Sequence, residues 1–489
     1  MTERIKNIFF RNKSSRQTVA KNVFWLGAGQ IGSRLIRAII IIYSARILGA
    51  AEYGVFSYVL NLAGLFTALT DIGIGAILTR ELIQKPEKRN QYFGTSFFIK
   101  TFILAIAALI IIFAGPHFSK IEAIKIIIPI ISLVVIFDTL RDFSLTVFRA
   151  EEKMEREAIV LILTNIAIVI FGFAALYFSK TAKILTWSYI AGLAVGFLIA
   201  FFILKDYFLK AFSSFSKNLV KPIISAAYPL AFLGVLGAFM INTDMFMLGW
   251  WRTAEEIGYY SAGQKIIQIL YLLPGILASA LFPVLSRFAA AKENKKIKEV
   301  TEKGLSMIFF IAIPMALGGI ILAGSIIEFV FGKEYLPATL SFQILLLTAI
   351  TYSPLLPLSN LIVAKDKQQE LKIPTLLGAG GNIFFNILFI PVYGIAGSSA
   401  ATVIAQIFNT GLIWKRAKKI NDFSVLRHLK KIVIATIIMG IFTFALRQIG
   451  LNVILNILIS IGIYLGVIFL LKEKIINEII ALVKGLKKA

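Results

Sequence analysis

The chain has 489 residues, of which 58% are hydrophobic and 16% are charged, and its formal net charge is +25. Because soluble domains are roughly 45–50% apolar and about 25% charged, this composition excludes an ordinary water-soluble fold. The sequence has no cysteine and only two histidines, His117 and His428. Disulfides and thiolate sites are therefore excluded, and almost no residues remain for histidine-based metal or catalytic sites. We expect neither a metal nor an organic cofactor.

Apolar runs of about twenty residues follow one another along the chain, and each can cross the ~30 Å hydrocarbon core of a bilayer as one helix. They predict an all-α, polytopic membrane protein with about fourteen transmembrane helices. The predicted helices are 22–45, 54–77, 92–114, 126–148, 158–178, 184–204, 222–249, 258–284, 304–324, 339–363, 373–390, 394–414, 432–446 and 451–471.

Lysine and arginine are distributed unequally between alternate connecting segments. Of the 51 cations, 38 lie in segments that face one side, 8 in segments that face the other, and 5 within the spans. By the positive-inside rule the richer side is cytoplasmic. We therefore expect both termini in the cytoplasm of a plasma-membrane protein, with the basic face contacting anionic lipids of the inner leaflet rather than nucleic acid.

Two short motifs recur and indicate an internal duplication. Residues 50–57 read AAEYGVFS and residues 254–261 read AEEIGYYS, while AEEK at 150–153 is echoed by AKDK at 364–367. Each pair is separated by six predicted helices, which gives both copies the same orientation in the membrane. The predicted parts are a cytoplasmic N-terminal segment (1–21), an N-lobe of helices 1–6 (22–204), a cytoplasmic inter-lobe linker (205–221), a C-lobe of helices 7–12 (222–414), a basic cytoplasmic loop (415–431), helices 13–14 (432–471) and an amphipathic cytoplasmic tail (472–489).

Several stretches resemble the polysaccharide-transporter (Wzx-type) branch of the multidrug/oligosaccharidyl-lipid/polysaccharide exporter superfamily. In the first half they are RILG at 46–49, EYG at 52–54, DIGI at 71–74 and RAEEKM at 149–154. In the second half they are Asp244, LG at 248–249, GYYSAGQK at 258–265, FGKEY at 331–335 and PVYGIAG at 391–397. The resemblance implies a transporter, not an enzyme. It implies a flippase that moves prenyl-pyrophosphate-linked oligosaccharide from the inner to the outer leaflet by alternating access, with glycan polymerases or glycosyltransferases as candidate protein partners.

Three cations inside predicted spans, Arg34, Arg37 and Lys265, are candidates for binding the diphosphate of such a substrate. A charge at membrane depth is costly and usually faces a cavity or a partner, and guanidinium groups match phosphate oxygens. The alternative is structural pairing, of the arginines with Asp71 and of Lys265 with Asp244. Lys100 is close enough to a span end to reach the membrane surface.

Four carboxylates, Asp71, Asp138, Asp142 and Asp244, are the only acids within the predicted spans. Asp138 and Asp142 flank Arg141 at helical spacing, which favours structural salt bridges. If transport is coupled to Na⁺ or H⁺, one of these four acids is the expected site.

Residues 27–32, GAGQIG, match the dinucleotide-binding fingerprint, but the apolar run that follows has no strand–helix–strand alternation. The small residues instead predict a close approach between helices. Two other functions are weighed against the flippase. A multidrug–cation antiporter of the same superfamily would need a carboxylate-lined cleft. A membrane glycosyltransferase or glycan polymerase would need a large outward loop or an Asp-x-Asp motif, and the sequence has neither.

Overall fold

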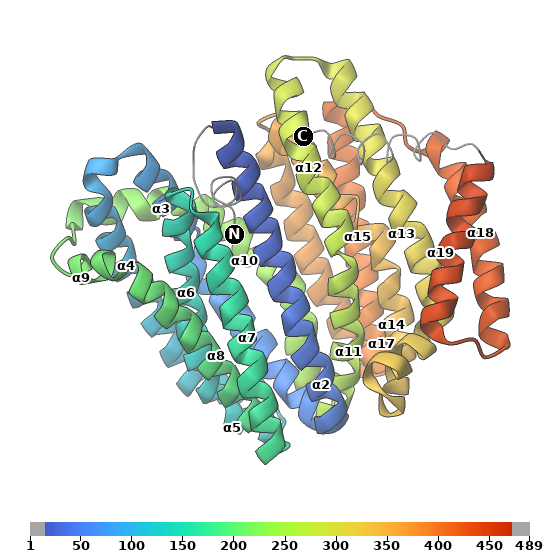
Figure 1. Ribbon diagram of the computed structural model, residues 1–489, viewed down its shortest axis with the longest axis horizontal. Coiled ribbons are helices and arrows are strands. Elements are labelled where there is room, and N and C mark those ends of the chain that lie inside the picture. The colour runs from blue at the N-terminus through green and yellow to red at the C-terminus, as the bar shows by residue number, and fades with distance from the viewer. Residues whose placement is uncertain (1–14, 472–489) are drawn as a thin grey trace, which may run out of the picture. The chain divides into compact units, whose positions relative to one another are not determined.

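The computed structural model describes residues 15–471, and every regular element in this range is a helix (Figure 1). The chain divides into two compact units, residues 1–258 and 259–489. The predicted amphipathic tail (472–489) and most of the predicted N-terminal segment (1–21) lie outside the described residues.

The first unit contains α2 (Ser15–Asp71), α3 (Ile74–Gln84), α4 (Arg89–Phe113), α5 (Glu122–Ile127), α6 (Ile131–Ala150), α7 (Met154–Phe178), α8 (Ala182–Ile203), α9 (Lys205–Ala211), α10 (Lys217–Trp251) and the start of α11 (Ala254–Leu270). The second unit contains the rest of α11, α12 (Leu272–Ala290), α13 (Asn294–Phe331), α14 (Thr339–Leu346), α15 (Thr348–Tyr352), α16 (Leu355–Ala364), α17 (Lys372–Ile420), α18 (Leu426–Gln448) and α19 (Val453–Leu470). Short 3₁₀ helices, η1 (Pro86–Lys88), η2 (Gly115–Phe118), η3 (Ile128–Ile130), η4 (Lys333–Ala338) and η5 (Gln368–Leu371), join several of them.

Ten of the described helices are long and apolar enough to cross a membrane, or eleven if the bent pair Phe24–Asp71 and Ile74–Gln84 is one span. This confirms the predicted all-α, multi-pass membrane fold. The number of uninterrupted spans is lower than the fourteen expected from the sequence, because several predicted helices run on into their neighbours.

Two of the long helices are broken at a glycine. Gly49 within the 57-residue α2 has φ 74° and ψ 172°, and Gly394 within the 49-residue α17 has φ 59° and ψ −137°. Positive φ is accessible to glycine without a steric penalty. At ~1.5 Å per residue, a straight helix of 49 or 57 residues would be more than twice as long as the ~30 Å hydrocarbon core is thick. Each of these helices therefore consists of two segments. Gly49 lies in a predicted connection, and Gly394 is the first residue of the predicted span 394–414.

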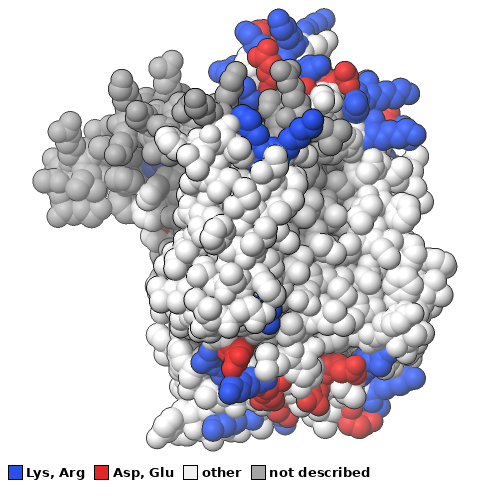
Figure 2. Space-filling model, turned by 90° about the vertical axis from the view of Figure 1, so that its right-hand side faces the viewer, with Lys and Arg blue, Asp and Glu red and all other residues white. Residues whose placement is uncertain are grey.

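Charge is confined to the ends of the helices on the face that carries α18 and α19. Figure 2 shows Lys, Arg, Asp and Glu gathered at the two ends of this face, with an almost uncharged band between them. Large apolar side chains of α19 are exposed, including Leu455 (51%) and Leu458 (59%). An exposed apolar surface of this extent is suited to lipid rather than water.

Close packing of α2 against α7 fixes the first segment of α2. A Cβ atom added to Gly29 would lie 2.8 Å from the Cα of Ala158, and one added to Gly172 would lie 2.7 Å from Ile40. The GAGQIG stretch is thus a helix–helix contact, as predicted, because its small residues let two backbones approach. At the start of the same helix the ammonium of Lys21 forms an ion pair of 2.9 Å with Glu155, and both side chains are nearly buried.

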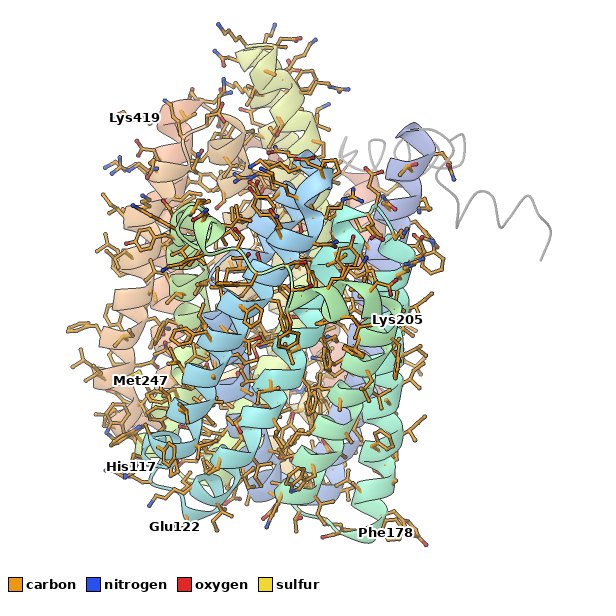
Figure 3. The ribbon with its side chains drawn as sticks, turned by 90° about the vertical axis from the view of Figure 1, so that its left-hand side faces the viewer. His117, Glu122, Phe178, Lys205, Met247 and Lys419 are labelled. Atoms are coloured by element: carbon orange, nitrogen blue, oxygen red, sulfur yellow. The ribbon has the colours of Figure 1, made fainter. Side chains whose placement is uncertain are left out.

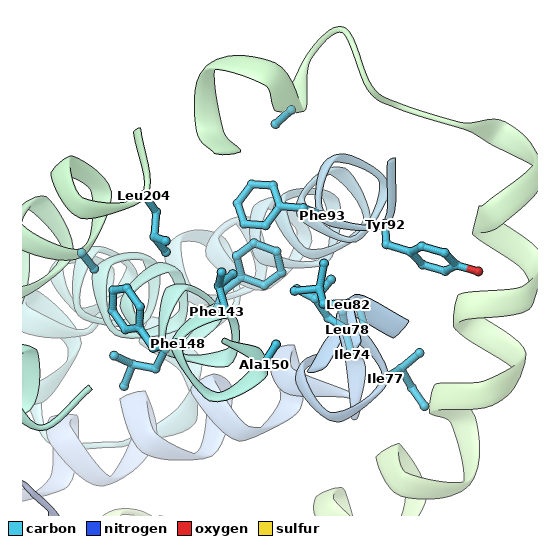
Figure 4. Packing of buried hydrophobic residues seen from close by; sticks show 14 of the residues in the cluster. Ile74, Ile77, Leu78, Leu82, Tyr92, Phe93, Phe143, Phe148, Ala150 and Leu204 are labelled. Atoms are coloured by element: carbon cyan, nitrogen blue, oxygen red, sulfur yellow. The ribbon is translucent and has the colours of Figure 1, made fainter. Parts of the chain in front are cut away.

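The core of the first unit is aromatic and joins α3, α4, α6 and α9. Figure 4 shows Phe93 and Phe143 side by side, with Leu78 and Phe148 nearby, and the two rings are 5.2 Å apart. Phe93 also contacts Phe208 of α9 edge to face at 5.2 Å. Aromatic pairs in these geometries add stability beyond the area that they bury. The core therefore holds α9 against α4.

In the second unit, buried hydrogen bonds attach α19 to α13 and α18 to α19. The Tyr464 hydroxyl of α19 donates to the carbonyl of Phe310 of α13 at 2.8 Å. The hydroxyls of Thr443 of α18 and Ser460 of α19 are 2.7 Å apart. Where no water is available, such bonds fix the pairing of helices. The two C-terminal helices are thus an integral part of this unit.

The two copies of the recurrent motif touch one another within the first unit. A Cβ atom added to Gly54 would overlap the carbonyl oxygen of Ala254, and one added to Gly258 would overlap that of Ala50. The contact is reciprocal because Ala50 and Gly54 are each 204 residues before Ala254 and Gly258. A small residue at every fourth position of two crossing helices permits this backbone approach.

We predict that Gly54→Leu lowers the thermal stability of the purified protein by several degrees, because overpacking of a close contact costs about 1–3 kcal/mol or more. Gly64→Leu, on the same helix, is the matched control, since no atom lies within 4 Å of a Cβ added there. The measurement is the unfolding midpoint in detergent. Equal midpoints for the two variants would contradict the proposed tight contact.

Candidate functional site

Six polar side chains from four helices of the first unit form what we call the intramembrane polar cluster. Its members come from α2, α6, α7 and α8: Arg37, Asp138, Arg141, Asp142, Asn165 and Tyr189. The helices that carry them pack directly against one another. A polar cluster in membrane-spanning helices is a functional-site candidate by its position alone.

Arg37 is bound by neutral groups. Its Nε donates a hydrogen bond of 2.8 Å to Oδ1 of Asn165, and its guanidinium lies 5.8 Å from the centre of the Tyr189 ring. Asn165 is fully buried and its Nδ2 donates to the carbonyl of Leu161 at 2.7 Å, which fixes the amide with its oxygen toward Arg37. Asn165 and Tyr189 therefore orient the guanidinium and leave its charge in place.

Arg141 forms the ionic part of the cluster. Its guanidinium is 2.6 Å from the carboxylates of both Asp138 and Asp142. The side chain of Arg141 is 6% exposed, that of Asp138 25% and that of Asp142 50%. Arg37 is also within electrostatic range of Asp138. The Nη1 atom of Arg141 is buried without a hydrogen-bond partner among the described residues. The cluster thus holds two cations and two anions, with one buried donor still able to bind an acceptor.

Arg34 lies one turn before Arg37 on α2 and is exposed. It forms no ion pair with any residue in 15–471. The expected alternative partner, Asp71, is instead bound to Lys100 at 2.7 Å. Lys100 was expected to reach the membrane surface, and this is wrong, because its side chain is only 3% exposed and is held by the Asp71 carboxylate.

The remaining predicted site residues lie elsewhere. Asp244 is buried in α10, and Lys265 is half-buried on α11 in the second unit. The gathering of Arg34, Arg37 and Lys265 at one diphosphate therefore stays a prediction. His117 lies outside the long helices, in η2, at the end of the first unit where Figure 3 also places Glu122 and Phe178.

Neutral polar residues were missed by the reasoning from sequence, which searched for charges. Asn165 and Tyr189 belong to this group. So does a seam in the second unit where the two segments of α17 meet: Asn382, Asn386, Ser398, Gln406, Asn409 and Thr410 are all buried there. A Cβ atom added to Gly378 would be 2.9 Å from Asn409, so the segments are close. In the sequence, these residues could have been recognised as amide side chains at helical spacing within otherwise apolar runs.

The seam contains oxygen atoms that lack hydrogen-bond donors. The side-chain oxygens of Ser398, Gln406 and Thr410 are buried without a partner in the described part of the chain. Neutral oxygens of this kind can accept from water or solvate a small hard cation. Within residues 15–471 no group of three or more His, Asp or Glu side chains could hold a metal ion.

Comparisons with solved structures show the fold. The structure described as "Lipid II flippase MurJ, inward closed conformation" superposes with a TM-score of 0.77 at 18% identity, covering 92% of this chain and 99% of that one. Among curated relatives, "Probable low-salt glycan biosynthesis flippase Agl15" of Haloferax volcanii is 23% identical over 416 residues, or 82% of each chain. "Capsular polysaccharide biosynthesis protein CapF" of Staphylococcus aureus is 19% identical over 79% of this chain and 96% of its own length.

Two family models match the sequence. One named MatE matches residues 229–392. The other, described as "Polysaccharide biosynthesis protein", matches residues 19–289, which is more than half of the chain. The match covers α2 to α12 and includes every member of the intramembrane polar cluster. As its Wzx-type motifs implied, the chain belongs to the polysaccharide biosynthesis protein family, a family of membrane transporters and not of enzymes.

Proposed function

We propose that the protein is a flippase that translocates prenyl-pyrophosphate-linked oligosaccharide from the inner to the outer leaflet by alternating access. The observation that carries this proposal is the state of the two arginines of α2. Arg37 is held by a neutral amide and an aromatic ring, and Arg34 is exposed without an ion pair among the described residues. Both therefore offer positive charge, and guanidinium binds diphosphate oxygens in a bidentate manner.

The proposed topology has fourteen spans. The breaks at Gly49 and Gly394 each divide one long helix into two segments, and α10 has 35 residues, enough to cross the bilayer once. The two segments of α2, the two segments of α17 and α10 make five spans. The nine span candidates in the described range other than the one that contains α17 bring the number to fourteen. The termini lie in the cytoplasm, by the positive-inside rule, and residues 22–204 and 222–414 form the two lobes.

In this proposal the membrane potential drives transport. A diphosphate carries about two negative charges, and moving each outward across 100 mV, inside negative, gains ~2.3 kcal/mol. Lys265 supplies a third cation to the diphosphate from the C-lobe. Asp71, Asp138 and Asp142 act as partners of Lys100 and Arg141, as their ion pairs of 2.6–2.7 Å support. A multidrug–cation antiporter would need such carboxylates unpaired, which disfavours that alternative.

The topology predicts which positions are reachable from outside an intact cell. Because the chain has no cysteine, single cysteines can be introduced at exposed sites without background labelling. We expect cysteines at Ser213, Asn294 and Lys418 to be protected from an impermeant maleimide, and cysteines at Thr181 and Lys333 to react. Permeabilised cells should label at all five positions. Labelling of Asn294→Cys in intact cells would reverse the orientation.

The arginines predict a transport phenotype without a folding phenotype. Arg34→Ala and Arg37→Ala should each reduce flipping by more than tenfold while expression and insertion stay near normal. Arg34→Lys should keep partial activity, because the charge remains but the bidentate geometry is lost. The assay is quenching of a fluorescent prenyl-diphosphate sugar in proteoliposomes.

Lys265→Ala should behave like the arginine variants, and the addition of Asp244→Ala should not restore transport. Restored transport in that double variant would make Lys265 a structural partner of Asp244 and would remove it from the diphosphate site. Aggregation of Arg34→Ala would likewise assign Arg34 a structural role.

The Asp71–Lys100 pair predicts the opposite pattern. Asp71→Asn leaves a buried ammonium without its carboxylate, which should cost about 3 kcal/mol of stability. The double variant Asp71→Asn, Lys100→Met should recover most of this loss, and the folded fraction of each variant should still flip substrate. A stable Asp71→Asn protein that has lost flipping would instead assign Asp71 to ion coupling.

A further inference from the structure

A groove runs along the first turns of α10. Its volume is ≈ 640 Å³, and it is lined by Lys217, Val220, Lys221, Ile224, Ser225 and Tyr228. These positions recur at three- and four-residue intervals and therefore lie on one side of the helix. The groove is separate from the intramembrane polar cluster, which contains no residue of α10.

The groove is cationic at one end and apolar along its length. Lys217 and Lys221 are one helical turn apart, both are exposed, and neither forms an ion pair with a described residue. Further along, Ile224 and Tyr228 are 44% and 69% exposed. At ~1.5 Å per residue, the step from Lys217 to Tyr228 spans about 16 Å. A ligand that matches this surface has a phosphate head and a single long apolar chain.

The lysines stand on a fixed support. The backbone N–H of Ser216, directly before α10, donates to Oγ1 of Thr95 at 3.0 Å, and the rings of Phe212 and Phe215 pack on Phe98 at 5.4 and 5.3 Å. Phe212 is nevertheless 71% exposed. An exposed aromatic ring beside lysines is typical of the interface between lipid headgroups and hydrocarbon. The cationic end of the groove is therefore held at the depth of the headgroups.

We propose that this groove is a lateral binding site for the prenyl diphosphate carrier itself. Lys217 and Lys221 hold the diphosphate, and the prenyl chain lies along Val220, Ile224 and Tyr228. Two adjacent cations match a diphosphate better than the single charge of a common anionic phospholipid, and a strip on one helix accommodates one chain better than two. The identity of the lipid rests on the proposed flippase function, while the site rests on the groove and its charges.

The test is photocrosslinking with a diazirine analogue of farnesyl diphosphate, using the full chain in phosphatidylcholine nanodiscs. Crosslinks mapped by mass spectrometry should concentrate on residues 217–228. Excess farnesyl diphosphate should reduce them at least fivefold, whereas farnesol, which lacks the diphosphate, and phosphatidylglycerol should not. Lys217→Gln, Lys221→Gln should lower the yield at least fivefold, and Lys217→Arg, Lys221→Arg should keep it.

Lys205→Gln, Lys210→Gln is the matched control, because both lysines are exposed in the same segment but do not line the groove. This control should crosslink normally, and all variants should elute as single species in size exclusion. Equal labelling of the Lys217/Lys221 glutamine variant, competition by farnesol, or equal competition by phosphatidylglycerol would overturn the proposal. Arg37→Ala should keep full crosslinking, so that failure of flipping and failure of this site can be told apart.

Discussion

A charged side chain within a bilayer must find a partner or water, because lipid offers neither hydrogen bonds nor a high dielectric. The first unit is organised around this constraint. Lys100 is buried and paired with the exposed Asp71, Arg141 lies between Asp138 and Asp142, and Lys21 is paired with Glu155 where α2 begins. The Lys100–Asp71 pair joins α4 to α2 and the Lys21–Glu155 pair joins α2 to α7, so these two pairs also specify which helices are neighbours, whereas Arg141 is neutralised within α6.

Against this background of paired charges, the arginines of α2 are different. Arg37 is positioned by an amide and an aromatic ring, and Arg34 is exposed with no ion pair among residues 15–471. In the proposed diphosphate site this arrangement favours binding, because a carboxylate partner would compete with the diphosphate. The buried Nη1 of Arg141 adds a donor close to the same residues. In the cluster, the charge of Arg141 is balanced by Asp138 and Asp142, whereas the guanidinium of Arg37 is held by neutral groups.

Small residues determine how closely the helices approach. Gly29 and Gly172 bring α2 onto α7, and the reciprocal contacts of Gly54 and Gly258 bring the two motif copies together. In a membrane, where apolar surface gains little by leaving lipid, such close van der Waals contacts provide much of the association energy. The groove on α10 is lined by exposed lysines at one end and by apolar residues beyond them.

The sequence alone determined the membrane class, the all-α fold and the family, because hydropathy, charge asymmetry and short motifs are properties of local sequence. It also identified which charges lie at membrane depth. Only the tertiary structure decided their partners. Asp71 forms an ion pair with Lys100 and not with the arginines, and Arg37 contacts Asn165 and Tyr189, which lie more than a hundred residues further along the chain. The breaks of α2 at Gly49 and of α17 at Gly394, with no loop between the two segments, were likewise decided by the tertiary structure. Pairing depends on the rotation and depth of each helix, which packing sets and which a hydropathy pattern does not encode.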